Sequence, residues 1–118
     1  MSATAQRLDD FEDEQTTTVD PAVALKEDAY WEERFCVEQY YTPGLDYEDY
    51  APAYGVGYIG FAQYGGVYDD AETSLEANWV RIKGDSRLSM EEARLAMRAA
   101  WDRMAARRER SALRWLVS

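Results

Sequence analysis

The sequence predicts an all-α protein: a small helical bundle built on an antiparallel helical hairpin and preceded by a disordered acidic segment. Two amphipathic stretches, 69–83 and 89–106, repeat apolar residues at helical spacing and are separated by a short link. A third stretch, 46–66, repeats aromatic residues at the same spacing. We therefore expect an acidic tail over 1–20, a helical domain over 21–106 and a basic amphipathic extension over 107–118.

The first segment, 1–20, is rich in Ser, Thr, Gln, Asp and Glu and has little to bury, so we expect it to be disordered. Its acidic run is expected to act as a solubilising tail. The run consists of Asp9, Asp10, Glu12, Asp13 and Glu14.

The next segment begins with Asp20 and Pro21, which are typical of an N-cap and a first helical position. A helix is predicted from there toward Phe35. Trp31 and Phe35 lie one helical turn apart and are expected in the core. The helix is followed by a turn, which Pro43 and its neighbouring glycine indicate.

Aromatic residues define the stretch 46–66, where they follow one another at steps of 3, 4, 4 and 3: Tyr47, Tyr50, Tyr54, Tyr58 and Phe61. This spacing favours a helix, although a strand over 56–61 stays open. Gly55, Gly57 and Gly60 each weaken a helix by about 1 kcal/mol relative to Ala, so another backbone is expected to approach closely. An aromatic stripe of this kind is core or interface, and we interpret Tyr54, Gly57, Tyr58 and Phe61 as a Gly/Tyr interaction surface.

The hairpin is predicted from its capping residues and apolar faces. Asp69 with Glu72 is interpreted as a capping pair, and Gly84 is placed to end that helix. Ser89 with Glu92 forms the capping box of the second helix. The second helix places its apolar residues on one face: Ala93, Met97, Ala100, Trp101 and Met104.

The composition restricts the chemistry. Thirteen basic and 23 acidic residues give a net charge of −10, which disfavours binding of the whole chain to nucleic acid or an anionic membrane. The chain has no histidine, which excludes Ser-His and Cys-His catalysis and His-ligated metals. The carboxylate groupings match no EF-hand loop. We therefore expect no catalytic residues, no cofactor and no metal site, and we interpret the protein as a non-enzyme.

A single cysteine, Cys36, allows no intrachain disulfide and is expected to be at least half-buried. The chain shows no signal-like segment and no run of apolar residues long enough for a membrane span. These features predict a cytoplasmic protein.

The extension 107–118 surrounds apolar residues with arginines. We interpret it as a partner or self-association helix anchored by Trp115 and Leu116, with the guanidinium groups meeting an acidic surface. A membrane or nucleic-acid contact, and a plain solvated helix end, are the alternatives. Its arginines are Arg107, Arg108, Arg110 and Arg114.

Three stretches carry a resemblance to known sequences: YWEERF at 30–35, DYEDYAPAYGVGY at 46–58 and LEANWVRIKGDSRLSMEEARLAMRAAWDR at 75–103. In these the chain resembles a group of small bacterial proteins of no established activity, which the resemblance associates with stress responses. The group often has Arg where this chain has Gly55 and often ends near Arg103. The departures imply a surface altered for a partner, and the resemblance supplies no catalytic residues.

Together these patterns predict a noncatalytic interaction or assembly protein. It would self-associate, or bind another protein, through the Gly/Tyr surface, the basic extension or both. The alternative is an acidic decoy or inhibitor that binds a basic protein or occupies a nucleic-acid-binding site.

Overall fold

The computed structural model describes residues 19–117, with side chains through Leu113, and the predicted disordered tail lies largely outside this range. Four α-helices form: α1 (Pro21–Arg34), α2 (Tyr47–Tyr64), α3 (Tyr68–Ile82) and α4 (Met90–Val117). A 3₁₀ turn, η1 (Phe35–Val37), follows α1. Residues 19–117 contain no strand, so the all-α prediction is confirmed and 56–61 is helical.

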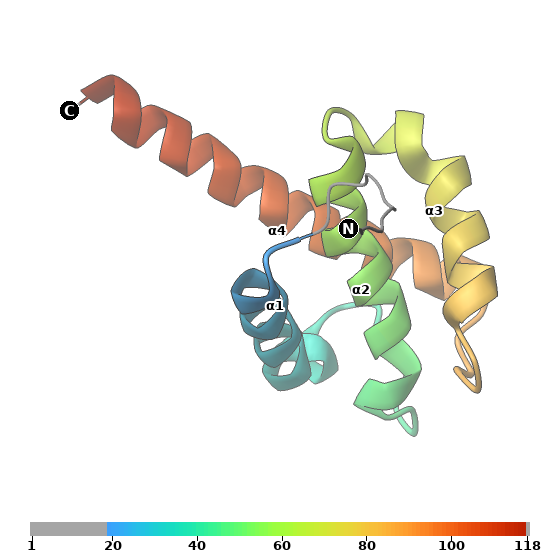
Figure 1. Ribbon diagram of the computed structural model, residues 1–118. Coiled ribbons are helices and arrows are strands. Elements are labelled where there is room, and N and C mark those ends of the chain that lie inside the picture. Colours follow the sequence, from blue (N-terminus) through green and yellow to red (C-terminus); the bar gives the residue numbers. More distant parts are fainter. Residues whose placement is uncertain (1–18, 118) are drawn as a thin grey trace, which may run out of the picture.

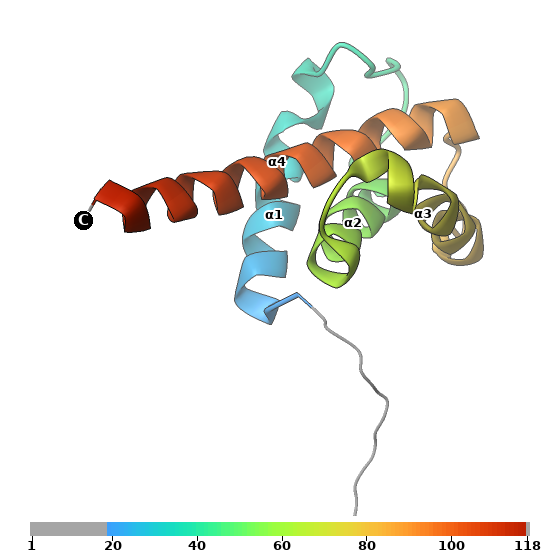
Figure 2. The same cartoon turned by 90° about the horizontal axis from the view of Figure 1, so that it is seen from above.

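Helix α2 lies at the centre of the bundle. Helix α3 runs beside it in the opposite direction, α1 lies on its other side, and α4 crosses behind (Figure 1). The view from above shows the same order and shows α4 reaching well past the other helices (Figure 2). Gly65 and Gly66, with φ of 65° and 72°, make the tight connection from α2 to α3.

Side-chain caps start three of the four helices. The predicted box at α4 is present: the Ser89 amide donates to Glu92 Oε1 at 2.9 Å, and the Glu92 amide donates to Ser89 Oγ at 3.1 Å. Asp46 and Asp49 form the same box at α2, and Asp20 Oδ1 caps α1. The predicted pair at 69 and 72 was wrong, because α3 begins one residue earlier, at Tyr68, without a side-chain cap.

The link between α3 and α4 is short, as predicted, and Gly84 within it has a φ of 55°. Ion pairs join Glu76 to Arg94 and Asp69 to Arg98, so the earlier residue of α3 pairs with the later residue of α4. The two axes cross obliquely (Figure 1), and α4 packs its buried face mainly on α2.

The closest approach in the bundle is at Gly57. A Cβ at this position would lie 2.3 Å from the backbone oxygen of Met97 and 2.8 Å from Ala100 Cβ. A side chain at Gly57 would therefore push α2 away from the α4 backbone. A Cβ at Gly60 would lie 2.5 Å from Leu75 Cδ2 of α3, at the end of a side chain that can move aside. The close approach of another backbone, predicted from these glycines, is therefore a contact between helices of the same chain.

An ion pair between a buried carboxylate and an exposed guanidinium group ties the start of α2 to the link before α4. The Asp49 carboxylate accepts from the Arg87 side chain, at 2.7 Å from Nη2, and from the Arg87 backbone amide at 3.0 Å. Ser86 Oγ donates to the Asp49 carbonyl at 2.5 Å. The Asp49 side chain is 8% exposed, so its charge depends on these donors.

Gly55 and Gly57 of the central helix are expected to respond in opposite ways to alanine. Gly57→Ala should lower the free energy of unfolding by about 1–3 kcal/mol, because the methyl group meets the Met97 carbonyl. Gly55→Ala is the control: its Cβ would have nothing nearer than 4.0 Å, and alanine favours a helix by up to about 1 kcal/mol. Urea unfolding of both variants measures the difference. Equal effects would contradict the close contact at Gly57.

The pair formed by Asp49 and Arg87 predicts acid sensitivity. Hydrogen bonds from the Arg87 side chain lower the pKa of Asp49 from 3.8 to about 2. Because the folded-state pKa lies below the unfolded one, the ionised group stabilises the fold above about pH 4, and this stability is lost as the pH falls toward about 2. Asp49→Asn should cost about 2 kcal/mol near neutral pH, and its difference from the unaltered chain should shrink in acid. Asp70→Asn, at an exposed acid of α3, should show neither effect in the same unfolding titration.

Candidate functional site

The Gly/Tyr residues predicted as an interaction surface lie in the core. Tyr54 is 0% exposed, and Tyr58 and Phe61 are each 8% exposed. Gly57 is buried against α4. The prediction of a self-associating Gly/Tyr surface was therefore wrong, because α4 of the same chain occupies the place assigned to a second copy. Helical spacing identified the buried face but not its partner.

The tyrosines form a structural cluster. Trp31 stacks on Tyr54 with ring centroids 4.4 Å apart, and the Tyr40 and Tyr54 hydroxyls are 2.6 Å apart. The Tyr47 hydroxyl donates to Asp28 Oδ1 at 2.6 Å. Burial raises the pKa of Tyr40, Tyr47 and Tyr54, so these phenols stay neutral over the ordinary pH range. Their role is to fix α1 and the following loop to α2.

Within residues 19–117, no group of three or more His, Cys, Asp or Glu side chains is arranged to hold a metal ion. The longest helix, α4, carries too many charged residues to cross a membrane, and no other described helix is suited to do so. Cys36 is exposed on η1, contrary to the prediction, because this 3₁₀ turn directs it away from the bundle. Among the described residues, no group is identified that would activate this lone thiol.

Arg107, which the sequence assigns to the extension 107–118 and to the partner residues, is in contact with α1 of the bundle. Its Nη1 lies 3.0 Å from Glu27 Oε2, and Arg103 Nε lies 3.0 Å from Glu27 Oε1. The Glu27 side chain is 0% exposed. The Arg103 guanidinium also stacks over the Tyr30 ring, 3.5 Å from its centroid. Two guanidinium groups of α4 thus balance one buried carboxylate of α1.

Sequence reasoning missed Glu27, which has no distinguishing pattern inside α1. Its only signal was indirect. A carboxylate on the same helix face as Trp31, one turn away, must be buried with a cation if that face packs. The partners lie 76 and 80 positions later in the chain, beyond the reach of any local pattern.

Beyond Arg107 the helix becomes exposed, and we call residues 108–117 the α4 end. Arg108 is exposed and lies over the Phe61 ring, with Cζ 5.9 Å from the centroid. Arg110 is exposed, and Leu113 is 57% exposed. The ion pairs among the described residues include neither Arg108 nor Arg110. The predicted residues Arg114, Trp115 and Leu116 continue α4, and their side chains lie outside the described range.

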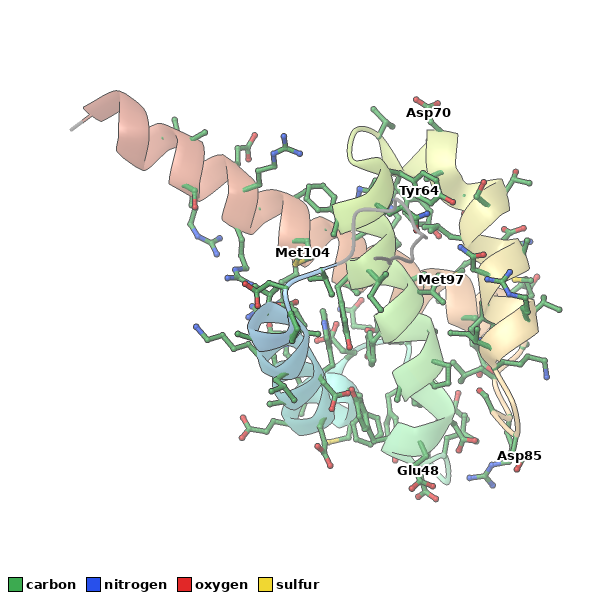
Figure 3. All side chains as sticks on the ribbon, in the orientation of Figure 1. Glu48, Tyr64, Asp70, Asp85, Met97 and Met104 are labelled. Atoms are coloured by element: carbon green, nitrogen blue, oxygen red, sulfur yellow. The ribbon has the colours of Figure 1, made fainter. Side chains whose placement is uncertain are left out.

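Two open hollows flank Arg108 where α4 leaves the bundle. The larger, of about 500 Å³, lies on the Gly66 side, and the smaller, of about 210 Å³, lies on the Val23 side. Figure 3 shows Met104 close to the point where α4 begins to project. Residues that line the smaller hollow are Val23, Phe61, Met104, Arg107, Arg108 and Ser111. The smaller hollow therefore offers cationic groups beside apolar ones, whereas the larger one is also lined by Asp102 and Glu109.

A separate groove of about 250 Å³ runs between α2 and α3. Ile59 and Ile82 on its walls are 41% and 50% exposed, and Arg81 lies at its edge. No described element covers this groove. None of the residues that line it belongs to the α4 end.

No family model, no curated protein and no solved structure matches the chain. The resemblance to a group of small bacterial proteins therefore stays a prediction.

Alanine variants of Arg107 and Arg110 should distinguish an arginine that stabilises the fold from one that is exposed and does not. Arg107→Ala removes one of the two cations that neutralise the buried Glu27 and should lower the free energy of unfolding by about 1–3 kcal/mol. Arg110→Ala, one helical turn later and exposed, should change it by less than about 0.5 kcal/mol. Thermal or urea unfolding makes the comparison. If Arg107→Ala leaves the free energy of unfolding unchanged, Arg103 alone is sufficient to neutralise Glu27.

Proposed function

We propose that the chain is a noncatalytic interaction or assembly protein whose contact surface is the α4 end. The observation that carries the proposal is that α4 continues beyond Arg107 and exposes Arg108, Arg110 and Leu113. An exposed helical turn that combines apolar and cationic side chains is a common form of protein recognition surface. The buried Gly/Tyr face plays no part in this contact.

Charge supports an acidic partner, and a second copy of the chain has the required chemistry. Three arginines and Glu109 give the α4 end a formal charge of +2, which leaves −12 on the remainder of the chain. Pairing two such basic ends with one another would bring like charges together. Contact between one basic end and the acidic remainder of another copy avoids this repulsion and is head-to-tail in kind.

The proposal extends to the setting of the protein. A cytoplasmic location is consistent with one unpaired, exposed thiol at Cys36. A stress-associated bacterial role belongs to the proposal through the sequence resemblance alone.

Truncation should test the α4 end without disturbing the fold. A chain that stops after Arg108 keeps the contact of Arg107 with Glu27, which a stop at Ala106 would remove. Light scattering at low ionic strength should give an assembly for the full chain and a single-chain mass for the truncated one. High salt should also reduce the mass of the full chain, because the contact pairs exposed charges.

Point variants supply the matched control. Replacement of Arg110 and Arg114 by Ala should lower the assembly mass, whereas Arg81→Ala, at the groove between α2 and α3, should leave it unchanged. A full chain that is a monomer at every concentration would rule out self-assembly. Salt-sensitive binding of that monomer to a basic protein would then support the acidic decoy instead.

A further inference from the structure

The surface beside Arg108 has a second feature, which is its closeness to the start of the described chain. Val23, in the first turn of α1, lines the smaller hollow together with Arg107, Arg108 and Ser111. Asp20 caps this helix, so the chain enters the fold next to the basic part of α4. Whatever precedes Val19 is attached close to the α4 end.

The preceding segment has the opposite charge. It contains five carboxylates within residues 9–14 and one basic residue, Arg7, in 1–18. Arg108 and Arg110 are exposed on α4 without an ion pair among the described residues. Charge complementarity therefore favours contact between this segment and these two guanidinium groups.

We propose that the acidic run 9–14 binds the α4 end of its own molecule and competes there with the partner. The occupant of the smaller hollow is thus a segment of this chain, held by charge-assisted hydrogen bonds to Arg108, with Arg110 exposed two residues later on α4. This inference rests on the proposed function only for the competition. The intramolecular contact itself stands on the geometry of α1 and α4.

The tether is long enough for the contact. Residues 9 and 14 lie 10 and 5 positions before Val19, which an extended chain spans in about 33 and about 17 Å. The helix from Arg107 to Val117 is about 15 Å long. Because the segment is attached at α1, it competes as if present at about millimolar concentration. A second copy must bind the α4 end strongly enough to displace a segment that is present at this effective concentration.

Amide NMR spectra of the full chain test the contact directly. The variant replaces the five acids by amides: Asp9→Asn, Asp10→Asn, Glu12→Gln, Asp13→Asn and Glu14→Gln. We expect the amide signals of residues 104–113 to shift, and the same shifts to appear in the unaltered chain at about 0.5 M salt, where screening is strong. The shifts should be independent of protein concentration.

A control removes the same charge elsewhere, at five exposed acids of the described chain: Glu32→Gln, Glu33→Gln, Glu48→Gln, Asp70→Asn and Asp85→Asn. It should leave the signals of 104–113 in place. Equal shifts in this control would mean that the shifts arise from the change in net charge, which would overturn the proposal. Unchanged spectra for the first variant would also overturn it. Shifts that disappear on dilution would also overturn it, because the contact would then join two molecules.

Light scattering separates this proposal from the one on which it rests. If the acidic run competes with a second copy, its neutralisation should strengthen self-association by about tenfold, whereas the control should not. A chain that shows the NMR shifts but never associates would retain the intramolecular contact and refute assembly. A chain that associates through the α4 end but lacks the NMR shifts would retain assembly and refute the intramolecular contact.

Discussion

The fold depends on the contact between α2 and α4 at Gly57. The Met97 carbonyl oxygen lies where a side chain of residue 57 would begin, so the two backbones come closer than any side chain at this position would allow. This approach lets Trp101 reach the Phe61 ring, edge to face at 5.3 Å. The cost of glycine in a helix is offset by the apolar area that both helices bury. Nearly every large core side chain of α2 lies within two turns of this point.

Two ion pairs then fix the ends of the elements that this contact brings together. Asp49 and Arg87 hold the start of α2 to the entrance of α4, and Glu27 holds α1 to the far part of α4. Both carboxylates are buried, so each would be costly without its guanidinium partners. The hydrogen bonds of these ion pairs are directional, so they fix where the helices begin and where they cross. Apolar packing alone does not fix these positions.

Local patterns predicted the helices well because their causes are local. The box of Ser89 and Glu92 and the apolar stripe through Met97 and Trp101 act within one or two turns of chain. What a buried face packs against is not local. The stripe from Tyr54 to Phe61 carried the right spacing, but nothing in it distinguished α4 from a second copy. The role of Arg107 escaped for the same reason, since Glu27 lies in a different helix.

The division between Arg107 and Arg108 limits how a partner can use the α4 end. A partner carboxylate that drew Arg107 away would leave Glu27 buried with one cation fewer, so binding there would oppose folding. Arg108 and Arg110 carry no such obligation among the described residues. In the proposed function, recognition is therefore confined to the turns after Arg107, where the acidic run or a partner can contact the exposed arginines without disturbing the core. One uninterrupted helix would then serve the fold in its first part and the proposed recognition in its last.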